Sequence, residues 1–87
     1  MDAPQKLEFP CDYPIKVMVR DGAGVRLAVT AVIERHAGTE AAGRCSERLS
    51  AEGRFAGLTY TIRANGPEHI AALFGDLRGI PGVMLVL

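Results

Sequence analysis

The segment Asp21-Gly22-Ala23-Gly24 carries the residue types of an anion-binding turn. It follows an alternating run and precedes a helical pattern, so it should join a strand to the amino end of a helix. Free amide groups at a helix start, together with glycines that allow close approach of the backbone, suit a negatively charged ligand. Neither a GxGxxG pattern nor a Walker phosphate loop is present. The segment is therefore the predicted site for a small carboxylate effector.

The two histidines and two cysteines form no sequence motif for catalysis or metal binding. His36 ends the first helical stripe, with no second His, Cys or carboxylate at a catalytic or metal-like spacing beside it. His69 falls in the first turn of the second predicted helix and is interpreted as a solvated neighbour of Glu68. Cys11 and Cys45 belong to no CxxC or Cys/His cluster, and neither is predicted to be reactive. No catalytic residue, metal ligand or cofactor is predicted, so an enzyme is the least favoured class.

Composition limits the class of protein further. The chain has 87 residues, of which 48% are hydrophobic and 23% are charged, as expected of one ordinary globular domain. Ten basic and ten acidic residues give zero net charge, which argues against a general binder of nucleic acids or membrane surfaces. The polar amino end has no export signal, and two cysteines are too few for a disulfide framework. We expect a cytoplasmic protein with free thiols and no membrane span.

Alternation and helical spacing predict six elements in the order strand, helix, strand, strand, helix, strand. Residues 1–6 are expected to form a flexible arm, and residues 7–87 a single domain. Asp21 and Asn65 are the predicted helix caps, and residues 39–43 a loop. The expected strands are Tyr13–Arg20, Arg44–Ser50, Phe55–Arg63 and Val83–Leu87, and the expected helices end near Ala37 and Arg78.

This order predicts an α+β fold of the ferredoxin-like βαββαβ type. Right-handed crossovers place both helices on one face of a four-stranded antiparallel sheet with the strand order 4-1-3-2. The predicted core is Val17, Val29, Ile33, Leu58, Ile62, Leu73 and Phe74, and the final, wholly apolar strand is expected to be buried. The helix-free face should carry Lys16, Met18, Arg20, Arg48, Thr59, Thr61, Arg63, Met84 and Val86. No aromatic residue is predicted there, which disfavours RNA binding by base stacking, whereas such a mixed face suits contact with another protein.

Several short segments, in their order and spacing, resemble the YbeD-like family of small bacterial proteins of unknown function, from about Leu7 to Leu87. They are Leu7-Glu8-Phe9-Pro10, Tyr13-Pro14-Ile15-Lys16-Val17-Met18, Arg35-His36-Ala37, Ser50-Ala51-Glu52-Gly53-Arg54-Phe55, His69-Ile70 and Val83-Met84-Leu85-Val86-Leu87. The resemblance implies a ferredoxin-like fold similar to the ACT regulatory domains of amino-acid-metabolising enzymes. It also brings a family label as a lipoate-related regulator, and no catalytic motif.

The resemblance also bears on the predicted site. In ACT-like domains the loop at the position of residues 21–24 contributes to effector binding at a subunit interface. Ala41-Ala42-Gly43 and Asn65-Gly66-Pro67 are more glycine-rich than the family pattern. These departures fall in loops, so the identity of the ligand does not transfer.

The sequence therefore favours a non-enzymatic, cytoplasmic regulatory or binding module that senses a small carboxylate. Its expected protein partners are a second copy of itself or a partner enzyme, and neither nucleic acids nor membranes are expected. A protein-interaction adaptor without a small ligand is the first alternative, and an RNA-binding module is the next.

Overall fold

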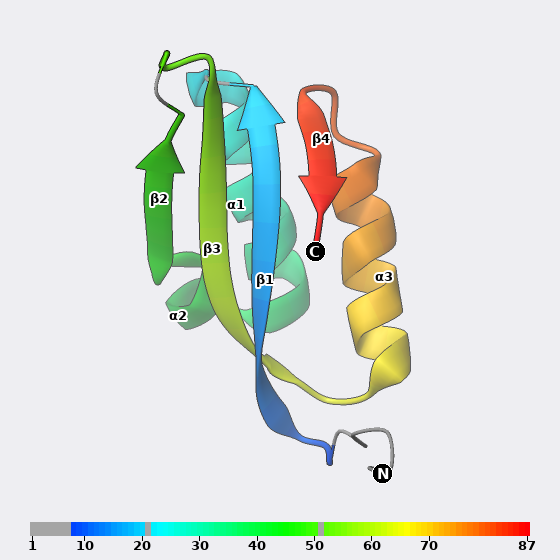
Figure 1. Ribbon diagram of the computed structural model, residues 1–87. Coiled ribbons are helices and arrows are strands. Elements are labelled where there is room, and N and C mark those ends of the chain that lie inside the picture. Colours follow the sequence, from blue (N-terminus) through cyan, green and yellow to red (C-terminus); the bar gives the residue numbers. More distant parts are fainter. Residues whose placement is uncertain (1–7, 21, 51) are drawn as a thin grey trace, which may run out of the picture.

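A computed structural model describes residues 8–20, 22–50 and 52–87 of the chain (Figure 1). Its four strands form one antiparallel sheet in the order β2-β3-β1-β4, with helices α1 and α3 on the same face. The predicted α+β ferredoxin-like fold and its strand order are confirmed. Residues 1–6, the predicted arm, lie outside the described residues. The elements are β1 (Cys11–Arg20), α1 (Ala23–Ala37), α2 (Thr39–Ala42), β2 (Cys45–Leu49), β3 (Phe55–Ala64), α3 (Pro67–Arg78) and β4 (Val83–Val86).

The two central strands, β1 and β3, pair along their whole ten-residue lengths. Because side chains alternate along a strand, this pairing sends one set of residues toward the helices and the other set to the helix-free side, here called the open face. Phe74 was predicted to be buried, but it is half-buried under the guanidinium of Arg78, which lies 5.5 Å from its ring centroid. The large, fully buried side chains are Ile15, Val17, Val19, Val29, Ile33, Leu58, Tyr60, Ile62, Leu73 and Leu77.

Helix α1 begins after Gly22 and ends before Gly38. Gly38 has a φ of +96°, a left-handed conformation that favours glycine, and its N–H donates to the carbonyl of Glu34. No side chain of the described residues caps the amino end at Gly22, and Asp21, the predicted cap, lies outside them. The predicted loop over residues 39–43 was wrong. Its two alanines and its glutamate form the helical turn α2, which also buries Ala41.

Helix α3 begins with Pro67, as predicted, where the missing N–H of proline removes no hydrogen bond. The predicted cap was wrong by one residue, because Gly66 rather than Asn65 precedes the helix. The backbone N–H of Asn65 instead donates to Nδ1 of His69 at 3.0 Å.

Strand β4 differs from the prediction in which of its side chains face the helices. An irregularity between Met18 and Val19 shifts the pairing, so that Val17 faces Val86 and Met18 faces Leu85. Val86, predicted on the open face, is therefore buried in the core, and Leu85 lies on the open face beside Met18.

The open face is also more apolar than predicted. Met84, Leu85 and Leu87 are 53%, 50% and 60% exposed, so β4 is not the buried strand that its composition suggested. The expected absence of aromatic residues was wrong as well. Phe55 pairs with Arg20 and belongs by alternation to the open face.

Truncation of Ile62 should test the register of β3. Ile62 is 1% exposed, so Ile62→Ala removes buried methyl groups and should lower the free energy of unfolding by about 2 to 5 kcal/mol. The matched control is Thr61→Ala on the exposed side of the same strand, expected to change stability by about 0.5 kcal/mol or less. Urea denaturation measures both, and a larger loss in the control would mean that the two faces had been exchanged.

Candidate functional site

The segment predicted to bind an effector lies at the start of α1. Gly22 precedes the helix, Ala23 is its first residue, and Gly24 is exposed. Gly22 has an extended backbone with φ 166°, which any residue adopts, and its carbonyl accepts from the N–H of Arg26 at 3.3 Å. A side chain at Gly24 would meet nothing within 4 Å. This is an open surface rather than a cleft, and Asp21 lies outside the described residues, so binding here stays a prediction.

A hollow of about 490 Å³ lies on the open face, over β1, β2 and β3. Two rows of residues cross the three strands beneath it. Arg48 faces Gly57, which faces Met18, and in the next row Ser46 faces Thr59, which faces Lys16. We call this depression the Gly57 hollow, and its full lining is Lys16, Met18, Ser46, Glu47, Arg48, Leu49, Ser50, Gly57 and Thr59.

Gly57 forms the floor of the hollow because it has no side chain. A Cβ atom added there would lie 3.3 Å from Sδ of Met18 and 3.6 Å from Cε of Lys16. The side chains of these two neighbours therefore close over the glycine. A larger residue at position 57 would push both aside and fill the space.

The hollow is bordered by two cations that form no ion pair among the described residues. Lys16 and Arg48 have no ion pair within the described residues, and neither has Arg20 farther along the same face. By contrast, Arg63 on this face pairs with Asp12 at 3.4 Å. The net positive charge of this surface therefore lies at and near the hollow, although the chain as a whole is neutral.

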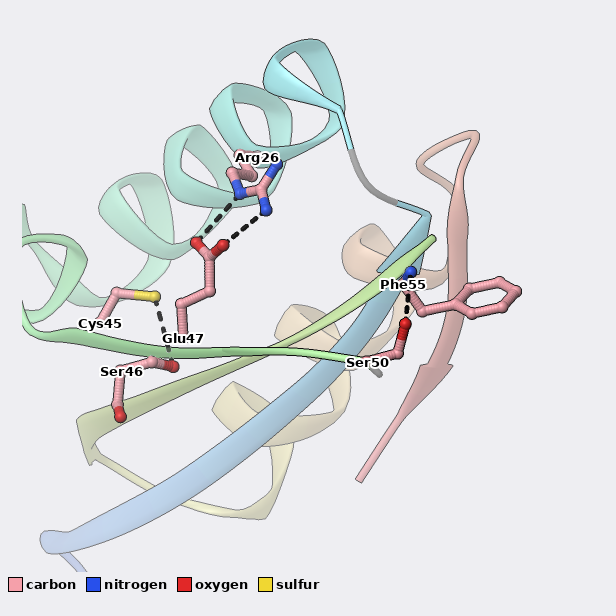
Figure 2. A network of polar contacts seen from close by, with 6 residues as sticks. All are labelled: Arg26, Cys45, Ser46, Glu47, Ser50 and Phe55. Atoms are coloured by element: carbon pink, nitrogen blue, oxygen red, sulfur yellow. Dashed lines mark hydrogen bonds and ion pairs between the residues drawn. The ribbon is translucent and has the colours of Figure 1, made fainter. Parts of the chain in front are cut away.

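Glu47 contributes to the rim of the hollow, but its carboxylate is paired with a cation on α1 and does not neutralise the positive charge of Lys16 and Arg48. Arg26 on α1 donates to Oε1 of Glu47 at 3.0 Å and also to Oε2 (Figure 2). Ser46, next along β2, points to the opposite side of the strand (Figure 2). The edge strand therefore keeps its acid on the helix side and presents a hydroxyl to the open face.

A second cluster joins the carboxyl end of α1 to α3. Nε2 of His36 donates to Oδ2 of Asp76 at 2.6 Å, and Arg35 donates to the same oxygen at 3.3 Å. Nε2 of His69 donates to the carbonyl of His36 at 2.6 Å, while its Nδ1 accepts from the N–H of Asn65. With these partners, Nε2 of His69 acts as the hydrogen-bond donor and Nδ1 as the acceptor. We call this cluster the histidine clasp.

Sequence reasoning missed the histidine clasp. His36 and Asp76 are 40 residues apart, and only the packing of α1 against α3 brings them together. The interpretation of His69 as a solvated neighbour of Glu68 was wrong, because the ring is half-buried and hydrogen-bonded on both nitrogens. Within the described ranges, no group of three His, Cys, Asp or Glu could hold a metal ion. The clasp therefore connects helices rather than forming a metal centre.

Tyr60 and the two cysteines are the other side chains that could do chemistry. The hydroxyls of Tyr60 and Thr30 lie 3.0 Å apart, and burial raises the pKa of Tyr60 to about 12, so its phenol stays neutral near pH 7. Cys11 and Cys45 are free thiols, and Sγ of Cys45 donates to the carbonyl of Ser46 at 3.8 Å. None of these contacts pairs a nucleophile with a general base.

Comparison with known structures supports the fold assignment. The ACT domain from the GTP pyrophosphokinase of Chlorobium tepidum superimposes with a TM-score of 0.65 and 20% identity, over 87% of this chain and 94% of that domain. The ACT-like, ferredoxin-like architecture is therefore shared. No helix in the described part of the chain is long and apolar enough to cross a membrane.

Sequence comparison assigns the family. The chain belongs to the family described as "Protein of unknown function (DUF493)", which matches residues 4–87. Relatives named UPF0250 protein include one from Paraburkholderia phymatum, 38% identical over 93% of this chain and 91% of its own. Another, from Azotobacter vinelandii, is 41% identical over 94% and 90% of the two chains. The resemblance to the YbeD-like family of bacterial proteins is thereby confirmed.

The histidine clasp predicts how stability depends on pH. Hydrogen bonds from His36, and next from Arg35, lower the pKa of Asp76 below its ordinary value of 3.8. A carboxyl with a depressed pKa stabilises the fold above the pKa of the unfolded chain, and this stability is lost as the pH falls through the lower, folded value. Asp76→Asn should therefore lower the melting temperature at pH 7 and reduce the further loss of stability between about pH 4 and pH 2.

Thermal melts from pH 7 to pH 2 measure this effect. The control is Glu34→Gln, an exposed acid on α1 that has no ion pair among the described residues. Equal pH profiles for Asp76→Asn and Glu34→Gln would contradict a stabilising role for the clasp.

Proposed function

We propose that this protein is a non-enzymatic regulatory module whose effector is a small carboxylate. The observation that carries the proposal is the position of Lys16 and Arg48, two cations without ion pairs among the described residues, beside a hollow on a sheet face that no helix covers. A guanidinium binds both oxygens of a carboxylate, and an ammonium adds a point charge. The ACT-like fold supports a regulatory role by analogy only.

Both histidines form hydrogen bonds away from the hollow, and this supports a binding role over a catalytic one. His36 and His69, the two histidines of the chain, are both held in the histidine clasp, where α1 meets α3. The hollow offers cations and hydroxyls, which recognise an anion, and the carboxylate of Glu47 in its lining accepts hydrogen bonds from Arg26. Within this proposal the module works in the cytoplasm, either as a homodimer or on a partner enzyme.

A ligand screen tests the proposed function. Amino acids, keto acids and lipoate are added at increasing concentration while the melting temperature is followed, with titration calorimetry on any hit. A ligand at a hundred times its Kd should stabilise the fold by about 2.7 kcal/mol. No stabilisation by any member of the panel would contradict the carboxylate proposal and favour the adaptor, for which Met84, Leu85 and Leu87 offer exposed apolar surface.

The sequence-predicted site at the start of α1 has its own test within the same screen. Gly24→Val should leave the fold intact, since a Cβ atom there meets nothing within 4 Å. If the effector binds at the free amide groups of this helix end, the substitution should abolish binding by blocking close approach. A hit that Gly24→Val leaves unchanged would remove this site.

RNA binding is the alternative that the open face makes worth testing, because Phe55 shares this face with the cations Lys16, Arg20, Arg48 and Arg63. RNA-binding sheets stack bases on several aromatic side chains, and a single aromatic at the end of β3 supplies at most one such contact. We expect no binding of single-stranded RNA at micromolar concentrations in 150 mM salt. Fluorescence anisotropy measures this. Salt-sensitive binding that is lost in Arg20→Gln or Arg63→Gln would overturn the expectation.

A further inference from the structure

We infer that the Gly57 hollow is the carboxylate site, with Arg48 and Lys16 holding the anion and Gly57 letting the side chains on the floor lie close to the backbone. This inference rests on the proposed function and assigns its location. It replaces the start of α1 as the expected position of the effector, because the hollow combines a concave surface, positive charge and hydrogen-bond donors in one place.

The positions of the two cations follow from the strand register. Arg48 and Lys16 lie on strands that flank β3 on either side, in adjacent rows. Neighbouring strands are about 4.8 Å apart and the two rows about 6.8 Å apart, so the two side chains rise from points roughly 12 Å apart, and both are long enough to reach one small anion between them. Without an anion, neither of these two like charges has an ion pair among the described residues. A carboxylate would therefore be attracted by both groups.

Gly57 provides an independent reason to place a ligand here. Glycine weakens the interior of a strand because it has no side chain to pack and more freedom to lose on folding. The backbone does not require it, since Gly57 is not among the glycines with positive φ. What glycine allows at this position is the close approach of the side chains of Met18 and Lys16 to the backbone of β3. A side chain at position 57 would push both outward into the volume of the hollow, which a bound ligand would use.

The remaining donors favour a carboxylate over a phosphate. Thr59 and Ser46 form the row beside Gly57 and offer hydroxyls to the anion. The backbone amides of β3 are committed to the pairing with β1 and β2, so the nest of free N–H groups typical of phosphate sites is missing from the floor. One guanidinium, one ammonium and two hydroxyls fit the two oxygens of a carboxylate.

Acetate is the probe for the site, used in an NMR titration of the full chain with the ionic strength held constant. The amide resonances of Ser46, Arg48, Gly57 and Thr59 should shift more than those of Gly22 and Gly24. Arg48→Gln and Lys16→Gln should each weaken binding of acetate, and of any hit from the ligand screen, by about tenfold or more, as expected for loss of a charge-assisted hydrogen bond. Gly57→Ala should weaken binding similarly by raising the floor, and it requires Met18 to move only slightly.

Two matched variants separate a site from general surface charge. Arg20→Gln removes a cation that has no ion pair among the described residues but does not line the hollow, and Arg63→Gln removes one on the same face that pairs with Asp12. Both should bind within about twofold of the wild type if binding is specific to the hollow. Equal losses in Arg20→Gln and Arg48→Gln would overturn the inference.

The outcomes distinguish the site from the proposed function. Acetate shifts that map to the hollow, with no hit in the metabolite panel, would support the site and contradict the metabolite-sensing role. A metabolite that binds Arg48→Gln and Gly57→Ala normally but is lost in Gly24→Val would support the function and overturn the site. Shifts that cluster away from the hollow, or displacement of acetate by equimolar inorganic phosphate, would overturn the assignment as a carboxylate site.

Discussion

The pairing of β1 with β3 determines what every other element of this protein can contact. Its register places Ile15, Val17 and Val19 opposite Tyr60, Leu58 and Ala56 on the helix side. The same register places Lys16 and Met18 beside Thr59 and Gly57 on the open face. A shift of one residue would exchange the two sets, burying the cations and exposing the core. Both the hydrophobic core and the Gly57 hollow therefore depend on one pairing.

The fold was largely predictable because its signals are local. Alternation in β1 and β3, Gly38 at the end of one helix and Pro67 at the start of the other each depend on a few neighbouring residues. The errors fell where tertiary pairing overrides such signals. The irregularity beside Met18 changes which residues of β4 face the helices, and Val86 is therefore buried in the core. Because every residue of β4 is apolar, its sequence pattern could not indicate this change.

The candidate sites were harder to predict, since each combines residues that are distant in the sequence. The alternation already placed Lys16 and Arg48 on the open face, but only the register shows that Gly57 lies between their strands, beneath the side chains of Met18 and Lys16. The histidine clasp needed the packing of α1 on α3, which juxtaposes residues 40 positions apart. The glycine-rich segment before α1 was predicted as a site because its residues are contiguous in the sequence. In the structure, a side chain at Gly22 or Gly24 would meet nothing within 4 Å.

Strand β2 buries none of its five residues, although it forms one wall of the Gly57 hollow. Substitutions at exposed positions usually change stability by about 0.5 kcal/mol or less, so Ser46 and Arg48 can vary with little effect on folding. Under the proposed function, selection on ligand preference and selection on foldability act on different residues. A protein of this design can change its ligand chemistry along one edge strand without changing its core.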